Sequence, residues 1–179
     1  VPVLILNIQK PQISYRDQNH DRTIDHIFSL LSQDKHLVLV SDSGTPVISD
    51  PGFKLVRDVK SKGFEVVSIP GPSSIIAALS VSGLPTDKFT FLGFLPKKEG
   101  QRLNMLREYG EGDTTLTIFE SPFRVIRLLE EIHETLGDRY VCVANDLTKI
   151  HELVLTKKVS EILTKPVSFK EKGEFVVLV

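Results

Sequence analysis

Two loops rich in glycine, proline and serine are the parts of this sequence best suited to bind a small molecule. The first spans residues 41–52 and the second spans residues 69–74, and each directly follows an apolar run typical of a β-strand. In open α/β sheets, ligands bind at the carboxyl ends of strands, where backbone amides are free to contact them. Glycines let the backbone approach a ligand closely, and prolines stiffen the chain around them. The pattern therefore predicts a rigid, preorganised binding site.

Polar side chains in these loops could bind hydroxyl and amine groups of such a ligand. Asp42 and Asp50 offer carboxylates, and Thr45 and Ser73 offer hydroxyl groups. A structural role is the alternative for two of them: Asp50 would be a turn residue and Ser73 the N-cap of a following helix. Both interpretations of Ser73 stay open on the residues alone.

A second group of candidate residues follows the apolar run 114–119. Glu120 and Arg124 are four residues apart where a helix is expected to begin, with Pro122 at its first position. A solvated ion pair on the helix surface is the plain interpretation. The functional interpretation is that Glu120 accepts a proton from a substrate hydroxyl while Arg124 binds a phosphate. The residues do not decide which group is the general base.

Two further polar groups could contact a substrate that carries phosphates. One combines Lys149 with His151 and Glu152, and the other is a basic stretch after Pro96. Such a stretch is commonly a solvated helix face, although Lys and Arg beside a cleft also bind nucleic-acid phosphates. No set of His, Cys or carboxylate residues has the spacing of a metal site, so no metal is expected. The basic stretch consists of Lys97, Lys98, Arg102 and Arg107.

The composition is that of an ordinary globular protein. The 179 residues are 41% hydrophobic and carry a formal net charge of −1, which argues against a wholly basic nucleic-acid binder. No apolar run approaches the roughly 18 residues of a membrane span, and residues 1–8 lack the features of a signal peptide. The single cysteine, Cys142, lies in an apolar run and is expected to be a buried thiol, which indicates a reducing, cytoplasmic setting.

Strand-like and helix-like segments alternate along the chain, which predicts an α/β fold. In the first half, strands at Leu37–Val40 and Glu65–Ile69 alternate with helices at Phe53–Lys62 and after Ser73, as in a βαβα unit. A change of pattern near Pro85 predicts two domains, 1–85 and 86–179. In the second domain the pattern predicts strands at 89–94, 114–119, 140–144, 153–156 and 174–179, and helices at 99–109, 122–136 and 159–163.

Six ordered motifs resemble those of a known family. Residues 41–52 are similar to its S-D-A-G-T-P-x-I-S-D-P-G motif, residues 70–74 to its P-G-P-S-A turn, and residues 93–96 to its G-F-L-P element. Residues 120–124, 147–152 and 172–176 match three more motifs in the same order. The chain therefore resembles the small-subunit ribosomal RNA methyltransferase I group of the tetrapyrrole methylase superfamily.

This resemblance implies two α/β domains with S-adenosylmethionine bound in the cleft between them, and methyl transfer to the ribose 2′-hydroxyl of an rRNA cytidine. It also implies a homodimer and, as partner, small-subunit rRNA or the 30S subunit. Catalytic roles are expected for Glu120, Arg124 and Lys149, and substrate contacts for Lys97, Lys98, Arg102, Arg124, Lys149 and His151. Cofactor contacts are expected for Ser41, Asp42, Gly44, Thr45, Pro46, Pro70, Ser73, Ser74, Gly173 and Glu174.

The sequence departs from the family pattern in a few places. A P-x-G-N-L loop and an E-D-T-R segment usually precede the region that matches residues 10–15, and neither is present. Either these residues are missing from the sequence given, or the protein is a reduced relative with an incomplete cofactor site. We expect the former, because losing the first strand would expose a sheet edge. Asn145 and Asp146 stand where Arg-Glu is usual, which removes a cation, and Ser43 replaces alanine. The alternatives are a methylase of a tetrapyrrole or protein substrate, and a non-catalytic module that binds S-adenosylmethionine.

Overall fold

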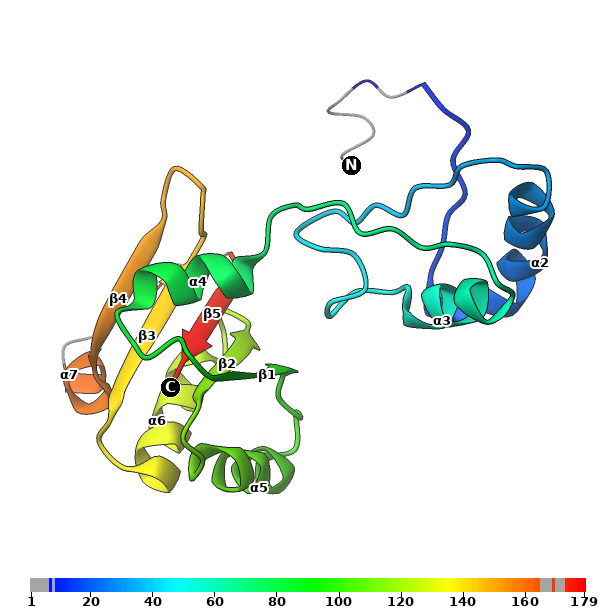
Figure 1. Ribbon diagram of the computed structural model, residues 1–179. Coiled ribbons are helices and arrows are strands. Elements are labelled where there is room, and N and C mark those ends of the chain that lie inside the picture. Colours follow the sequence, from blue (N-terminus) through cyan, green and yellow to red (C-terminus); the bar gives the residue numbers. More distant parts are fainter. Residues whose placement is uncertain (1–6, 8, 165–168, 170–172) are drawn as a thin grey trace. The chain divides into compact units, whose positions relative to one another are not determined.

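The computed structural model describes residues 7, 9–164, 169 and 173–179 (Figure 1). Contacts divide the chain into two compact units, Val1–Ser73 and Ser74–Val179. Helix α4 (Ser74–Ser82) belongs to the second unit, because it contacts three strands of that unit's sheet. The domain limits expected from the sequence, 1–85 and 86–179, stay a prediction.

The first unit contains two α-helices, α2 (His20–Leu31) and α3 (Phe53–Ser61), preceded by the short 3₁₀ helix η1 (Asp17–Asn19). Helix α3 is confirmed, whereas α2 was not predicted from the sequence. Its signal is nevertheless present, because Ile24, Ile27 and Phe28 recur at helical spacing. The Phe28 ring stacks on Phe64 beyond α3, with ring centroids 6.3 Å apart.

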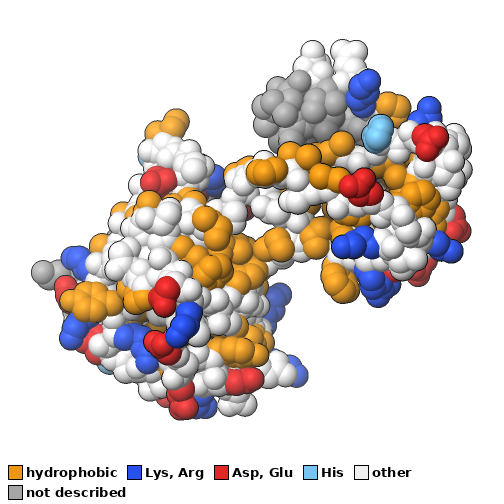
Figure 2. Space-filling view, in the orientation of Figure 1, with side chains coloured by type: hydrophobic (Ala, Val, Ile, Leu, Met, Phe, Trp, Pro, Cys, Tyr) orange, Lys and Arg blue, Asp and Glu red, His pale blue; other side chains and the backbone are white. Residues whose placement is uncertain are grey.

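The two strands predicted in the first unit, at 37–40 and 65–69, are wrong: within the part of this unit that the structure describes, no strand is formed. A strand requires hydrogen bonds to a neighbouring strand, and neither segment has such a partner. Their apolar side chains consequently stay uncovered, with Val38 and Ile69 each 79% exposed. Exposed apolar side chains are visible on this unit in Figure 2. The predicted βαβα unit is therefore not formed by the described residues.

The second unit is a five-stranded mixed sheet in the order β1-β2-β5-β3-β4. Strands β1 and β2 are parallel, and the other neighbours are antiparallel. All five strands and the three helices predicted after residue 86 are confirmed, with small shifts at their ends. Their bounds are β1 Phe89–Phe94, α5 Glu99–Gly110, β2 Thr115–Glu120, α6 Val125–Leu136, β3 Tyr140–Asn145, β4 Leu153–Lys158, α7 Val159–Thr164 and β5 Phe175–Leu178.

Side chains alternate between the two faces of this sheet, and each face has its own hydrophobic core. Val141, Val143 and Val177 contribute to the core shared with helices α5, α6 and α7. Cys142 and Leu178 point to the opposite face, where they pack with α4. The prediction of a buried Cys142 is confirmed, and burial raises the pKa of this thiol.

Helices α5 and α6 meet closely at Gly110, the last residue of α5. A Cβ atom at this position would lie 2.5 and 2.6 Å from the two Cδ atoms of Leu136. Because such overpacking costs about 1–3 kcal/mol, Gly110→Ala is expected to lower the free energy of unfolding measured with urea. Gly100→Ala is the matched control in the same helix, since open space surrounds that position and alanine favours helix formation. Equal stability changes in both variants would show that the close approach of Gly110 to Leu136 does not matter for stability.

Candidate functional site

The register of the sheet brings four of the sequence motifs to one end of the second unit. Glu120 at the end of β2 pairs with Phe175 at the start of β5, and Phe175 pairs with Asn145 at the end of β3. Phe94 at the end of β1 pairs with Phe119 of β2. Residues 94–97, 120–124, 145–152 and 173–175 therefore share this end, which we call the motif end. Lys172, which opens the last motif, lies outside the described residues.

Glu120 and Arg124 form an ion pair at the motif end. Arg124 Nη2 lies 2.7 Å from Glu120 Oε1, and the Glu120 side chain is only 1% exposed. The same Oε1 accepts a hydrogen bond from the Ser121 backbone N–H at 2.6 Å. Arg124 Nε also contacts the Ser121 hydroxyl at 3.4 Å, whereas Arg124 Nη1 is buried without a hydrogen-bond partner. The plain interpretation of a solvated pair is thus excluded for the carboxylate.

A cavity of about 570 Å³ opens beside this pair. It adjoins the beginning of α6, a helix that has no side-chain hydrogen bond at its N-cap. Four cationic side chains contribute to its wall, together with one largely exposed aromatic side chain, Phe123. Its lining consists of Lys97, Arg102, Glu120, Ser121, Phe123, Arg124, Arg127 and Leu128.

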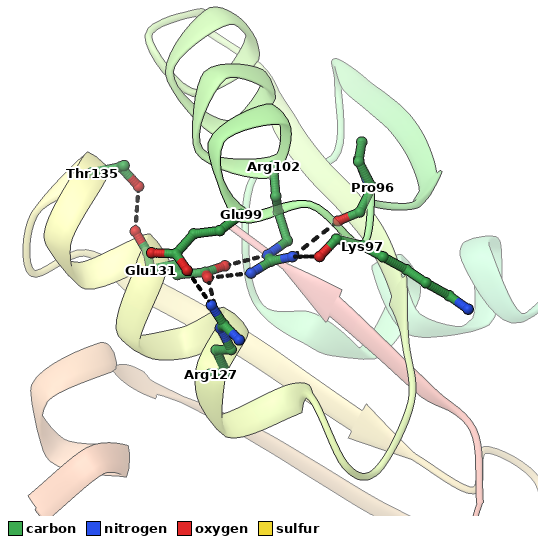
Figure 3. A network of polar contacts seen from close by, with 7 residues as sticks. All are labelled: Pro96, Lys97, Glu99, Arg102, Arg127, Glu131 and Thr135. Atoms are coloured by element: carbon green, nitrogen blue, oxygen red, sulfur yellow. Dashed lines mark hydrogen bonds and ion pairs between the residues drawn. The ribbon is translucent and has the colours of Figure 1, made fainter.

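Arg102 lies in this wall but is engaged in a buried network (Figure 3). Its Nε and Nη2 donate to both carboxylate oxygens of Glu131, and its Nη1 donates to the backbone oxygens of Pro96 and Lys97 at 2.9 and 3.0 Å. Its side chain is 4% exposed, and these four hydrogen bonds all lie inside the protein. In this structure Arg102 fixes the segment carrying Lys97 and commits four of its five N–H donors to protein oxygens.

Glu131 is the centre of that network. Burial on its own would raise the pKa of Glu131, but the hydrogen bonds and charges of Arg102 and then Arg127 outweigh burial and hold the pKa below its ordinary value of 4.5. Arg127 also pairs with Glu99. The Lys97 side chain points away from this network in Figure 3, and within the described part of the chain it forms no ion pair.

The turn between β3 and β4 carries the other basic motif. Lys149 Nζ lies 3.0 Å from Asp146 Oδ1 and 4.0 Å from Glu174 Oε2, and the hydrogen bond to Asp146 raises the pKa of Lys149. Gly173 is required here, because it has φ +119° and an added Cβ would lie 2.7 Å from Asp146 Oδ1. His151 is exposed in the same turn. The structure thus places Lys149, Gly173 and Glu174 together.

The glycine-rich loops lie in the first unit up to Ser73, and a hydrogen bond joins them. Thr45 Oγ1 donates to the backbone oxygen of Pro72 at 2.9 Å, and Ser41 Oγ donates within its own loop to the Ser43 and Gly44 oxygens. Gly44 has φ +66°, and nothing lies within 4 Å of the position of its missing Cβ. Val47 also has a positive φ, +76°, which is strained for a β-branched residue.

The other residues predicted for the cofactor also lie at these loops. Ser73 directly precedes α4, the place of an N-cap, and Ser74 is the first residue of that helix. Pro46 is half-buried in the first loop, and Pro70 and Asp42 are exposed. Lys98 is exposed directly before α5.

Sequence reasoning missed a buried polar cluster around His20, which is 5% exposed. The His20 ring nitrogens contact the Tyr15 hydroxyl and Asp58 Oδ2, each at 2.9 Å. Arg57, followed by His20, lowers the pKa of Asp58 against the effect of burial. The contact joins α2 to α3, so no pattern within one element could reveal it. Once both helices are placed, a histidine on the buried face of α2 would indicate such a contact.

The described residues form neither a metal-binding cluster nor a membrane-spanning helix. No group of three or more His, Cys, Asp and Glu side chains among these residues is arranged to hold a metal ion. None of the helices in this part of the chain combines the length and apolar character needed to cross a membrane.

Comparison with protein families shows where the similarity lies. The sequence model of the tetrapyrrole (corrin/porphyrin) methylases matches residues 5–163. A protein named ribosomal RNA small subunit methyltransferase I from Thermotoga maritima is 40% identical over 171 residues, which are 96% of this chain and 77% of that protein. The relative of the same name from Xylella fastidiosa is 41% identical over 175 residues, and this chain spans only 64% of its length.

Solved structures show the same fold at low sequence identity. Uroporphyrin-III C-methyl transferase from Thermus thermophilus, complexed with S-adenyl homocysteine, matches with a TM-score of 0.61 and 18% identity. The match covers 98% of this chain and 80% of that one. Diphthine synthase matches with a TM-score of 0.63 and 15% identity, over 91% of this chain and 65% of that one.

Proposed function

This chain belongs to the ribosomal RNA small subunit methyltransferase I family, within the tetrapyrrole methylases, and we propose from this that it methylates small-subunit rRNA with S-adenosylmethionine as donor. As acceptor we propose the ribose 2′-hydroxyl of a cytidine. The observation that carries the proposal is the gathering of Glu120, Arg124 and Lys149 at the motif end, beside a cationic cavity. Cations in such a place suit the phosphates of RNA.

The residues of the glycine-rich loops fit S-adenosylmethionine. Open space at Gly44 allows backbone contact with a ligand, and the Thr45–Pro72 hydrogen bond holds the two loops together. Hydroxyl and carboxylate groups of Ser41, Asp42 and Ser73 match the ribose hydroxyls and the amine of this cofactor. We propose these residues, with Pro46, Pro70 and the adjoining Ser74, as its contacts. When bound, the cofactor supplies a methyl group activated by a sulfonium.

The protein's own task is to align the acceptor and to remove its proton. We propose that Arg124, Lys97 and Lys149 hold phosphates of the RNA, with Lys98 and His151 at the margin of the same surface. The contacts described for Glu120 are made by Oε1, and we propose Oε2 as the atom that accepts the proton of the ribose hydroxyl.

The cofactor site is tested by Gly44→Val. A branched side chain at φ +66° is strained and fills the open space, so S-adenosylmethionine affinity measured by calorimetry on the full chain is expected to fall at least about tenfold. Gly63→Val is the control, because Gly63 also has a positive φ with open surroundings but lies after α3, outside both loops. Unchanged affinity in Gly44→Val would remove the assigned pocket.

The acceptor is tested by mass spectrometry of small-subunit rRNA and 30S subunits after incubation with the full chain and S-adenosylmethionine. The proposal expects 2′-O-methylcytidine. Methylation of a tetrapyrrole or a protein in place of rRNA would support one alternative, and cofactor binding without any methyl transfer would support a binding module. A homodimer and a cytoplasmic location are part of the same proposal and rest on the family.

A further inference from the structure

We propose that the cavity at the motif end binds one nucleotide that has left the base stack of the RNA, with its base resting on the Phe123 ring and a phosphate bound by Arg124 and Lys97. This inference rests on the proposed function and specifies it further. It predicts that the substrate is an unpaired nucleotide, selected by stacking as well as by charge.

The position of Phe123 supports the stacking. Its side chain is 83% exposed, on the loop 121–124 that lines the cavity. Phe94 at the motif end is 58% exposed, but its ring contacts Phe119 with centroids 5.6 Å apart, and Phe175 is buried, so Phe123 is the most exposed of these rings. A single exposed aromatic residue needs no explanation elsewhere on a surface. Beside cationic side chains, however, an exposed ring offers the flat apolar face on which proteins stack the bases of single-stranded RNA.

Arg124 supports the phosphate contact. Glu120 and Ser121 orient its guanidinium through Nη2 and Nε, while Nη1 is buried without a partner. A charged donor left in that state is costly, and an acceptor oxygen that displaces the covering atoms would relieve the cost. Lys97 adds a cation that no described ion pair engages, on a segment fixed by Arg102. Glu120 is thus a positioning residue for Arg124 as well as the proposed proton acceptor.

The size of the cavity agrees with one nucleotide. Its volume of about 570 Å³ falls within the roughly 300–1,000 Å³ of small-molecule sites. Bases in an A-form duplex are stacked and lie in a groove that side chains cannot enter, so a base reaches Phe123 only from a loop, a bulge or an unpaired end.

The test compares Phe123→Ala, Phe123→Leu and Phe123→Trp in the full chain, with Phe89→Leu as control. Phe89 is a half-exposed phenylalanine at the opposite end of β1. Phe123→Ala and Phe123→Leu are expected to lower RNA affinity and single-turnover methylation about 5- to 100-fold, whereas Phe123→Trp keeps both near the wild-type values. The slope of affinity against salt concentration should stay unchanged in all three, because no phosphate contact is lost.

The remaining variant isolates the phosphate contact. Lys97→Ala is expected to reduce that salt slope by about 0.7, the value for one cation on a single strand. If wild type binds RNA and Phe123→Ala matches it in affinity and rate, the stacking inference is overturned while the proposed function stands. Loss of S-adenosylmethionine affinity in Phe123→Ala would also overturn it, since the cavity would then serve the donor. Wild-type protein that neither binds nor methylates small-subunit rRNA would overturn the proposed function itself, and the inference with it.

Discussion

Replacing Glu131 by glutamine is expected to lower the free energy of unfolding by about 3–5 kcal/mol, because it breaks a buried ion pair while leaving its partner in place. Arg102 is 4% exposed and depends on Glu131 for both carboxylate contacts. Glutamine keeps the shape of the side chain but supplies one acceptor and no charge. Urea unfolding at neutral pH measures the loss.

Two comparisons isolate the buried pair. Lys88→Met removes an ion pair between exposed side chains, Lys88 and Asp113, and is expected to leave stability unchanged. The double variant Arg102→Met/Glu131→Met should lose less than the two single variants added together, because no unpaired charge remains buried. Additive losses in the double variant would show that the two side chains do not act as a pair.

The stabilisation by Glu131 is also expected to depend on pH. Since the pKa of Glu131 is lower in the folded protein than its ordinary value of 4.5, the folded state gains stability from the ionised carboxylate. The contribution is complete above pH 4.5 and is lost as the pH falls through the lower, folded-state pKa. The difference in stability between wild type and Glu131→Gln should therefore shrink as the pH falls below 4.5.

The second large effect is expected for Arg124→Ala. Truncating one partner of a hydrogen-bonded charge pair at an interface costs about 2–5 kcal/mol, so kcat/KM for small-subunit rRNA should fall by about 30- to 5,000-fold. The slope of RNA affinity against salt should fall by about 0.7, and S-adenosylmethionine affinity should stay constant. Lys149→Ala should give the same change of slope with a smaller loss of rate, because its side chain is 55% exposed.

A double variant distinguishes two roles of Arg124, binding an RNA phosphate and neutralising the Glu120 carboxylate. Arg124→Ala alone leaves the Glu120 carboxylate buried and unpaired, which could disturb the fold at the motif end. In Arg124→Ala/Glu120→Gln no such charge remains, so a role limited to neutralising Glu120 predicts that RNA affinity recovers. A role in binding phosphate predicts that RNA affinity stays low and its salt slope stays reduced. Glu120→Gln alone keeps an amide oxygen that can accept from Arg124, so it should bind RNA with near-normal affinity but methylate slowly in a single turnover. Equal single-turnover rates would exclude Glu120 as proton acceptor.

The second unit was predictable from the sequence because the apolar positions of its strands and helices are buried against one another within that unit. Strand β1 and helix α5 begin at the predicted residues, and the stripe of α6 that contains Leu128 and Ile132 is buried. In the first unit the apolar runs 37–40 and 65–69 also have a pattern typical of strands. A strand, however, needs a neighbouring strand to pair with, and the pattern of one segment does not reveal whether that neighbour exists. Helix α2 was missed although its apolar spacing is ordinary.

The sequence predicted which residues belong to the candidate site, but not which residues they pair with. The four-residue spacing of Glu120 and Arg124 indicates an ion pair, and the structure adds that its carboxylate is buried. Arg102 belonged to a basic stretch that suggested an RNA surface, yet it pairs with Glu131, 29 residues later in the chain. Such pairs depend on how α5 packs on α6. Because their separation along the chain follows no regular spacing, a single sequence does not reveal them. The same limit applies to His20 and Asp58.

The place of β5 has a consequence for synthesis of the chain. It is the last of the five strands to be translated, yet it lies at the centre of the sheet, between β2 and β3. While the ribosome is still adding residues, β1 can pair with β2 and β3 with β4, but these two pairs of strands share no backbone ladder until residues 175–178 emerge. The row Glu120–Phe175–Asn145 therefore forms in a single late event, through contacts distant in sequence, which are the slow ones to close. A nascent chain stalled before residue 175 would carry all of the candidate acceptor residues at the ends of strands that are not yet joined.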